Sequence, residues 1–189
     1  TMGDVSILKK GRKIVIDNQP WEVTDFDFCK PGKGQALYRC KLKNMMTGAT
    51  MDRTFRSSDR IEQANMEECD CVYSYKSGDQ YVFNDNDTYD EIFIKEQVLA
   101  GRHVYLNEND TCKILFFNQE PLEVTIPFFA ELCVTETEPG VRGDTATNVT
   151  KAATLNNGIE VQVPLFVNQG DFIRVDTRTG QYVERSKKA

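Results

Sequence analysis

The sequence has few of the features that mark several large classes of protein. It contains one histidine and one tryptophan, and no apolar run approaches the ~18 residues that a membrane-spanning helix needs. Its first residues contain no apolar segment, so we expect no signal peptide. These shortages predict a cytoplasmic protein with no membrane partner.

Metal and disulfide chemistry also find little support in the sequence. The cysteines include no CxxC pair, and His103 has no metal-ligand spacing to any of them. We therefore predict no metal site and no cofactor, and we expect free thiols in a reducing compartment. The six cysteines are Cys29, Cys40, Cys69, Cys71, Cys112 and Cys133.

A catalytic site is equally hard to assemble. A single histidine supports no convincing Ser-His-Asp triad, and we expect His103 to be an exposed loop residue. Lys33 follows a glycine, but Gly34 and then a strand follow it, whereas a phosphate loop needs Ser or Thr and then a helix. Residues 85–87 lack the later glycine and glutamate of a calcium loop. We predict that the chain is not an enzyme; an RNA-modifying or hydrolytic enzyme is the alternative from another class.

The net charge of −6 is unevenly distributed along the chain. Residues 1–64 contain 12 basic and 8 acidic residues, residues 65–128 contain 4 and 13, and residues 129–189 contain 7 and 8. A basic segment joined to a strongly acidic one favours contact with nucleic acid at the basic end. An ordinary solvated surface is the alternative.

The hydrophobic pattern predicts an all-β protein. Short alternating runs are separated by turn residues every 8–12 positions, which is typical of small β barrels or sandwiches, and no internal sequence repeat is evident. We predict three domains, with five strands in the last that suit an OB-fold; the domains span residues 1–64, 65–128 and 129–189. A helical turn is expected within 57–67, and strands are expected at 159–163 and 165–167.

A hairpin over residues 25–43 has two chemically different faces. Phe26 and Phe28 alternate with Asp25 and Asp27, so period-2 geometry separates the aromatic side chains from the acidic ones. On the returning strand the apolar face holds Ala36, Tyr38, Cys40 and Leu42, and the opposite face holds Arg39, Lys41 and Lys43. We predict a stiff two-stranded arm whose aspartates lie near the basic stripe, which is defined as Arg39, Lys41 and Lys43.

The tip of this arm presents one lysine between two glycines. Gly32 and Gly34 remove side-chain bulk around Lys33, and Pro31 restricts the backbone. From the residues alone three interpretations stay open: a plain turn, a contact with RNA phosphates, and an amine that is modified or inserted into a partner. The tip loop consists of Lys30, Pro31, Gly32, Lys33, Gly34 and Gln35.

Residues 151–170, KAATLNNGIEVQVPLFVNQG, resemble the signature of the elongation factor P family. The segments 30–36 (KPGKGQA), 139–146 (PGVRGDTA) and 175–186 (VDTRTGQYVERS) also resemble family segments and stand in the family's order. The resemblance extends from about Ile7 over the rest of the chain. The signature positions that agree are Lys151, Ala153, Gly158, Val161, Val163, Pro164, Val167 and Gly170.

This resemblance implies three β-barrel domains arranged as an L. The first would be SH3-like and related to KOW modules, and the other two would be OB-folds. It also implies a factor that binds both ribosomal subunits between the P and E sites, beside the peptidyl-tRNA. There it would stimulate peptide-bond formation and relieve stalling at consecutive prolines. We expect a monomer in the bacterial cytoplasm.

The resemblance also implies roles for residues of the arm. Lys33 matches the family's tip residue, which in one branch receives a β-lysyl group from a ligase related to lysyl-tRNA synthetase. Other branches carry arginine at this position and use a different modification, so lysine points to the first branch; a lysine-tipped branch with another modification is the alternative. Arg39, Lys41 and Lys43 would contact the RNA backbone of the tRNA acceptor arm; a solvated face paired with Asp25 and Asp27 is the alternative.

In the C-terminal third, the resemblance implies two further contact regions. Gly143, Asp144 and Thr145 match a loop that reaches the small subunit, and Tyr182 and Arg185 match positions associated with function. Edge-strand packing is the alternative for Tyr182. Another reading of the whole chain is a paralogous ribosome-binding or RNA-binding factor that acts on other stalling sequences.

Overall fold

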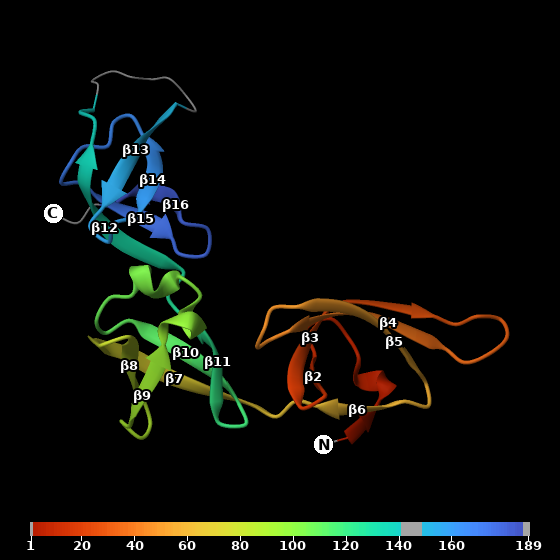
Figure 1. Cartoon of the computed structure of the whole chain (residues 1–189). Helices are drawn as coiled ribbons and strands as arrows, with labels where there is room; N and C mark the ends of the chain where they lie inside the picture. The colour runs from red at the N-terminus through yellow and green to blue at the C-terminus, as the bar shows by residue number, and fades with distance from the viewer. Residues whose placement is uncertain (1, 141–148, 187–189) are drawn as a thin grey trace. The chain divides into compact units, whose positions relative to one another are not determined.

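A computed structural model describes residues 2–140 and 149–186, whose strands form three sheets of consecutive chain segments (Figure 1). The prediction of an all-β protein built from small barrels is confirmed. The chain divides into two compact units, of which the first is Thr1–Glu68 with Leu115–Leu122 and the second is the remainder. The domain boundaries expected after residues 64 and 128 stay a prediction.

The first sheet has six strands in the order β1-β6-β2-β3-β4-β5. A tight turn at Asp17 and Asn18, with φ of 52° and 62°, joins β2 to β3. The alternating apolar residues of these strands form one core with the short 3₁₀ helix η1 (Val5–Ile7). The strands are β1 (Met2–Asp4), β2 (Lys13–Ile16), β3 (Gln19–Cys29), β4 (Leu37–Asn44), β5 (Thr50–Arg56) and β6 (Arg60–Gln63).

The helical turn expected within residues 57–67 is wrong, because Arg60–Gln63 is strand β6. The Asp59 carboxylate accepts a hydrogen bond from the backbone amide of Arg56 at 2.8 Å and closes a turn, so it does not cap a helix. Ile61 is 3% exposed in the core, and β6 pairs with both β1 and β2. A single buried residue in four is too little periodicity to distinguish a short strand from a helical turn.

The second and third sheets share one topology. Their orders are β11-β10-β7-β8-β9 and β14-β13-β12-β15-β16, so in each the first strand of the domain is central and its second and fourth strands flank it. This arrangement fits the five-stranded OB barrel. The strands are β7 (Met66–Ser77), β8 (Gln80–Asp85), β9 (Glu91–Lys95), β10 (Thr111–Phe117), β11 (Glu120–Thr125), β12 (Phe129–Thr137), β13 (Thr150–Leu155), β14 (Glu160–Pro164), β15 (Phe172–Asp176) and β16 (Gln181–Arg185).

Two local predictions in these sheets are wrong. The strand expected at 165–167 is a turn, because β14 ends at Pro164 and the amide of Val167 donates back to the Pro164 carbonyl at 3.2 Å. His103 is part of the 3₁₀ helix η3 (Arg102–Tyr105), after η2 (Glu96–Leu99), and is not an exposed loop residue. Its Nε2 lies 2.8 Å from a carboxylate oxygen of Glu96, and its side chain is 23% exposed.

Three further properties concern metals, thiols and membranes. Within residues 2–140 and 149–186, no group of three or more His, Cys, Asp and Glu side chains is placed to hold a metal ion. All six cysteines are free. No helix in the same ranges has the length and apolar character needed to cross a membrane.

Candidate functional site

The arm is formed by β3 and β4, which pair from Trp21 opposite Asn44 to Cys29 opposite Leu37 (Figure 1). A bulge at Thr24 interrupts the register, and the Thr24 hydroxyl donates to the Lys41 carbonyl at 3.1 Å. The arm has three strands, not the expected two, since β5 pairs with β4 as far as Arg56 opposite Leu37. A third strand adds a second ladder of hydrogen bonds and stiffens the arm.

All six residues of the tip loop, Lys30–Gln35, are exposed. Gly34 has φ of +106°, which L-residues rarely adopt, whereas Gly32 has no such φ. A Cβ on either glycine would meet nothing within 4 Å. The two glycines, which the sequence treats alike, therefore differ: only Gly34 is required by the backbone. Within the described chain, no hydrogen bond or ion pair engages the Lys33 ammonium.

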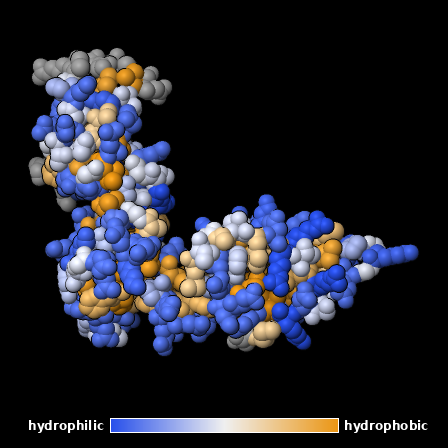
Figure 2. All heavy atoms as spheres, in the orientation of Figure 1, coloured by the Kyte–Doolittle hydropathy of each residue, from blue (hydrophilic) through white to orange (hydrophobic). Residues whose placement is uncertain are grey.

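Aromatic rings support the strands just behind the tip. The ring of Tyr38 lies 5.1 Å from that of Phe28 and 6.2 Å from that of Phe26. Phe28 is 50% exposed, and Figure 2 shows hydrophobic side chains at the surface among the hydrophilic ones of the arm. The predicted face is confirmed by the register, which pairs Phe26 with Cys40 and Phe28 with Tyr38. These tilted ring contacts stabilise the last pairs of the β3–β4 ladder, from which the loop projects.

The basic stripe lies on the opposite face, where carboxylates accompany it on both sides. Register places Asp27 opposite Arg39, and Asp25 and Asp52 on either side of Lys41. Lys43 likewise lies opposite Glu22 on β3. Within residues 2–140 and 149–186, none of the three stripe cations is within 4.0 Å of a carboxylate oxygen.

A shallow groove of about 300 Å³ runs over this face. Its charged lining is balanced, with Arg39, Lys41 and Arg53 against Asp25, Asp27 and Asp52, so this face is not a strongly positive surface. That balance supports the solvated-face alternative more than the sequence did. The expected RNA contacts of Arg39, Lys41 and Lys43 stay a prediction.

The candidate residues of the C-terminal domain are already engaged within it. Tyr182 is half-buried against the hydrophobic core of the third sheet, and burial raises its pKa above the usual value. The Arg185 guanidinium lies 5.2 Å from the Phe166 ring centroid and 3.8 Å from an Asp171 carboxylate oxygen.

Lys151 and the expected contact loop are the remaining C-terminal candidates from the sequence. The Lys151 ammonium donates to the Glu138 carbonyl and thereby ties the start of β13 to the residue that follows β12. Gly143, Asp144 and Thr145 lie outside the described residues. The structure therefore brings Lys33 and the stripe onto one arm and places Tyr182 and Arg185 on a different domain.

One basic cluster was missed by the sequence analysis. Lys9, Lys10, Arg12 and Lys13 stand within five residues, KKGRK, at the turn that precedes β2. The signal was present as four positive charges within five residues, but it was counted only within the total for residues 1–64.

Family profiles match the chain in three successive segments. Residues 4–61 match the "Elongation factor P (EF-P) KOW-like domain", residues 66–124 the "Elongation factor P (EF-P) OB domain", and residues 130–185 "Elongation factor P, C-terminal". The chain belongs to the elongation factor P family. Membership makes it a translation elongation factor and is consistent with a ribosomal partner.

Full-length relatives agree with this assignment. Elongation factor P of Desulfotalea psychrophila is 47% identical over 187 residues, which are 99% of this chain and 100% of the relative. Elongation factor P of Alkaliphilus metalliredigens is 48% identical over 177 residues, which are 94% and 96% of the two chains. The similarity thus extends through all three domains of the elongation factor P fold.

Solved structures support the fold of this elongation factor P family member. The structure named eukaryotic translation initiation factor 5A from Methanococcus jannaschii aligns with a TM-score of 0.55 and 20% identity, over 67% of this chain and 92% of that chain. A translation initiation factor eif-5a family protein from Naegleria fowleri aligns with a TM-score of 0.54 and 17% identity, over 66% and 97%. At these identities the likeness concerns the fold alone.

Proposed function

We propose that this elongation factor binds the ribosome between the P and E sites, beside the peptidyl-tRNA, and stimulates peptide-bond formation at consecutive prolines. The observation that carries the proposal is the placement of Lys33: one amine at the exposed tip of a three-stranded arm. Nothing in the described chain engages that amine, so it is available to a partner.

A stiff arm with a narrow tip suits entry into an RNA-lined site. The lysine cation would donate charge-assisted hydrogen bonds to phosphates, and its donors would also reach ribose or base edges. Holding the end of the tRNA in a geometry suited to attack would accelerate the reaction through orientation alone. This role asks for no proton transfer by Lys33.

Lys33 is also the proposed site of modification. A β-lysyl group added by a ligase related to lysyl-tRNA synthetase would lengthen the reach of the tip and add a second amine. The exposure of every residue from Lys30 to Gln35 supports access by such an enzyme.

The other contacts are part of the same proposal. Arg39, Lys41 and Lys43 would face the tRNA acceptor arm. Gly143, Asp144 and Thr145 would reach the small subunit, and Tyr182 and Arg185 would support the C-terminal contact. We retain the domain division at residues 64 and 128 on the same basis.

Replacement of Lys33 tests the proposal with a matched control in the same loop. Lys33→Ala and Lys33→Arg should both leave the free energy of unfolding within about 0.5 kcal/mol of wild type, because the side chain packs against nothing. Both should fail to relieve stalling on a polyproline reporter, since arginine keeps the charge but lacks a primary amine. Lys30→Arg, also exposed in the tip loop, should stay active.

All proteins in this experiment are produced with the modifying ligase, and intact mass verifies the modification. If Lys33→Arg relieves stalling as well as modified wild type, the amine is not the working group. If modified wild type itself leaves the stall in place, the proposed function is wrong.

A further inference from the structure

We infer that the basic turn, defined as Lys9, Lys10, Arg12 and Lys13, binds the phosphate backbone of RNA through the pocket beside it. The inference rests on the proposed ribosomal function and adds a contact site to it. On this inference the main positively charged surface of the first domain is the basic turn and not the basic stripe of the arm.

The turn is held firmly by backbone hydrogen bonds. The amide of Arg12 donates to the Lys9 carbonyl at 3.1 Å, and the amide of Gly11 donates to the Val23 carbonyl at 2.7 Å. Val23 in turn donates to the Arg12 carbonyl at 2.8 Å. Gly11 has φ of +89°, a conformation that favours glycine. Four cations are thus displayed on a turn tied to β3, and binding would not have to order the backbone.

The positive charge of the turn is little compensated. Lys9 and Lys10 are exposed, and none of the four cations forms an ion pair within residues 2–140 and 149–186. The register places one carboxylate, that of Glu22, opposite Lys13. A second carboxylate, that of Glu62 on β6, lies opposite Val15, two residues after Lys13 on β2. Four cations against these two neighbouring carboxylates contrast with the balanced charges of the basic stripe.

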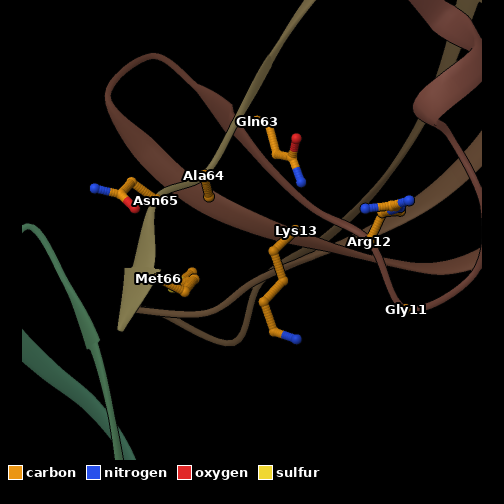
Figure 3. A pocket seen from close by; sticks show the side chains of 7 residues that line it. All are labelled: Gly11, Arg12, Lys13, Gln63, Ala64, Asn65 and Met66. Carbon is orange, nitrogen blue, oxygen red and sulfur yellow. The ribbon is translucent and has the colours of Figure 1, made fainter. Parts of the chain in front are cut away.

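A pocket of about 650 Å³ adjoins the turn (Figure 3). Its walls include Arg12 and Lys13 from the turn, Gln63 at the end of β6 and Asn65 just after it, and no acidic side chain lines it. Figure 3 shows the guanidinium of Arg12 and the amide of Gln63 on the same side of Lys13, whose ammonium extends away from them. Guanidinium, ammonium and amide N–H groups are the donors that proteins use to hold phosphate oxygens.

Arg12 is the residue best placed to bind. Its Nε is buried and has no hydrogen-bond partner within the described chain, and no carboxylate fixes its guanidinium. A buried donor without a partner is unfavourable, and a bound oxygen nearby would relieve that cost. Because four cations stand within five residues, the turn suits several linked phosphates better than one free anion.

The experiment measures binding of the full chain to a short fluorescein-labelled RNA duplex by anisotropy, from about 50 to about 200 mM salt. The test variant Lys10→Gln/Arg12→Gln keeps polarity and removes two charges. The control Lys95→Gln/Lys113→Gln removes two exposed charges from the second sheet, to which no RNA contact is assigned. The slope of log K against log[salt] should fall by about 0.9 for each lost phosphate contact in the turn variant and stay near wild type in the control. Circular dichroism verifies that both variants are folded.

An unchanged slope in the turn variant, or an equal fall of the slope in the control, overturns the inference. Polyglutamate serves as a second probe, an acidic polypeptide. If the turn variant loses binding to polyglutamate but keeps binding to the RNA duplex, the inference is also overturned, because the turn would then recognise an acidic protein. If inorganic phosphate at matched ionic strength binds at the turn, and the turn variant binds the RNA duplex like wild type, the turn is only a free-anion site and the inference is wrong. The duplex measurement does not involve Lys33, so it separates this inference from the stalling assay that judges the proposed function.

Discussion

Replacing Gly34 with alanine should disturb the tip loop far more than the same change at Gly32. A Cβ at either position would meet nothing within 4 Å, so neither substitution creates a clash. The two differ in backbone conformation, since φ is +106° at Gly34 and lies outside the left-handed region at Gly32. Forcing an L-residue into such a conformation costs about 1–2 kcal/mol, and that strain is the expected magnitude for Gly34→Ala.

The loop has two ways to respond to this strain. It can keep its shape and lower the free energy of unfolding by up to about 1–2 kcal/mol, or it can relax and move the Lys33 amine. Urea denaturation measures the first response, and relief of stalling on a polyproline reporter measures the second. Gly32→Ala should stay within about 0.5 kcal/mol of wild type and remain active.

Equal behaviour of the two variants in both assays would refute this reasoning. The tip would then not depend on the left-handed conformation of Gly34, and its glycines would matter only for their small size.

Three further measurements test other parts of the structure. Ile61→Ala should lower the free energy of unfolding in urea by about 2–5 kcal/mol, and a negligible change would argue against β6 as part of the core. Burial raises the pKa of Cys71 to about 12, so iodoacetamide at mildly alkaline pH should label exposed Cys29 and spare Cys71 until the protein is denatured. Hydrogen bonds from Arg178 hold the pKa of Asp176 below its usual range, so this carboxylate stabilises the fold above the pKa of unfolded aspartate. That contribution is lost as the pH falls through the lowered folded pKa, and Arg178→Gln, which removes the side-chain bonds but keeps the backbone one, should reduce this part of the acid dependence in a circular-dichroism titration.

The faces of the arm could be predicted because strand alternation has a period of two. Once the hairpin is placed, Phe26 and Phe28 must share a face, and Asp25 and Asp27 must share the other. The partner on the far side of β4 could not be predicted in this way. Asp52 reaches Lys41 through the pairing of β5 with β4, and nothing in the local pattern specifies which strand lies beside which.

Backbone conformation and strand topology could not be predicted from the sequence. Gly32 and Gly34 are the same residue type in similar positions, and the difference in their φ angles is set by the closure of the loop around them. Sheets two and three share a strand order although no repeat is visible in their residues, since different apolar side chains can fill equivalent barrels. His103 was misplaced for a related reason: its contact with Glu96 joins two 3₁₀ helices that propensity alone does not predict.

The mixed charges on the outer face of the arm have a kinetic consequence. A face with only lysine and arginine would adhere to any exposed RNA, and each such encounter would have to end before the next could begin. If the stripe contacts RNA as proposed, the neighbouring carboxylates Asp25, Asp27, Asp52 and Glu22 would raise the dissociation rate and shorten the dwell time on unsuitable RNA. On the proposed function, a factor with such an arm would search many ribosomes quickly and would remain only where the tip finds its own contacts.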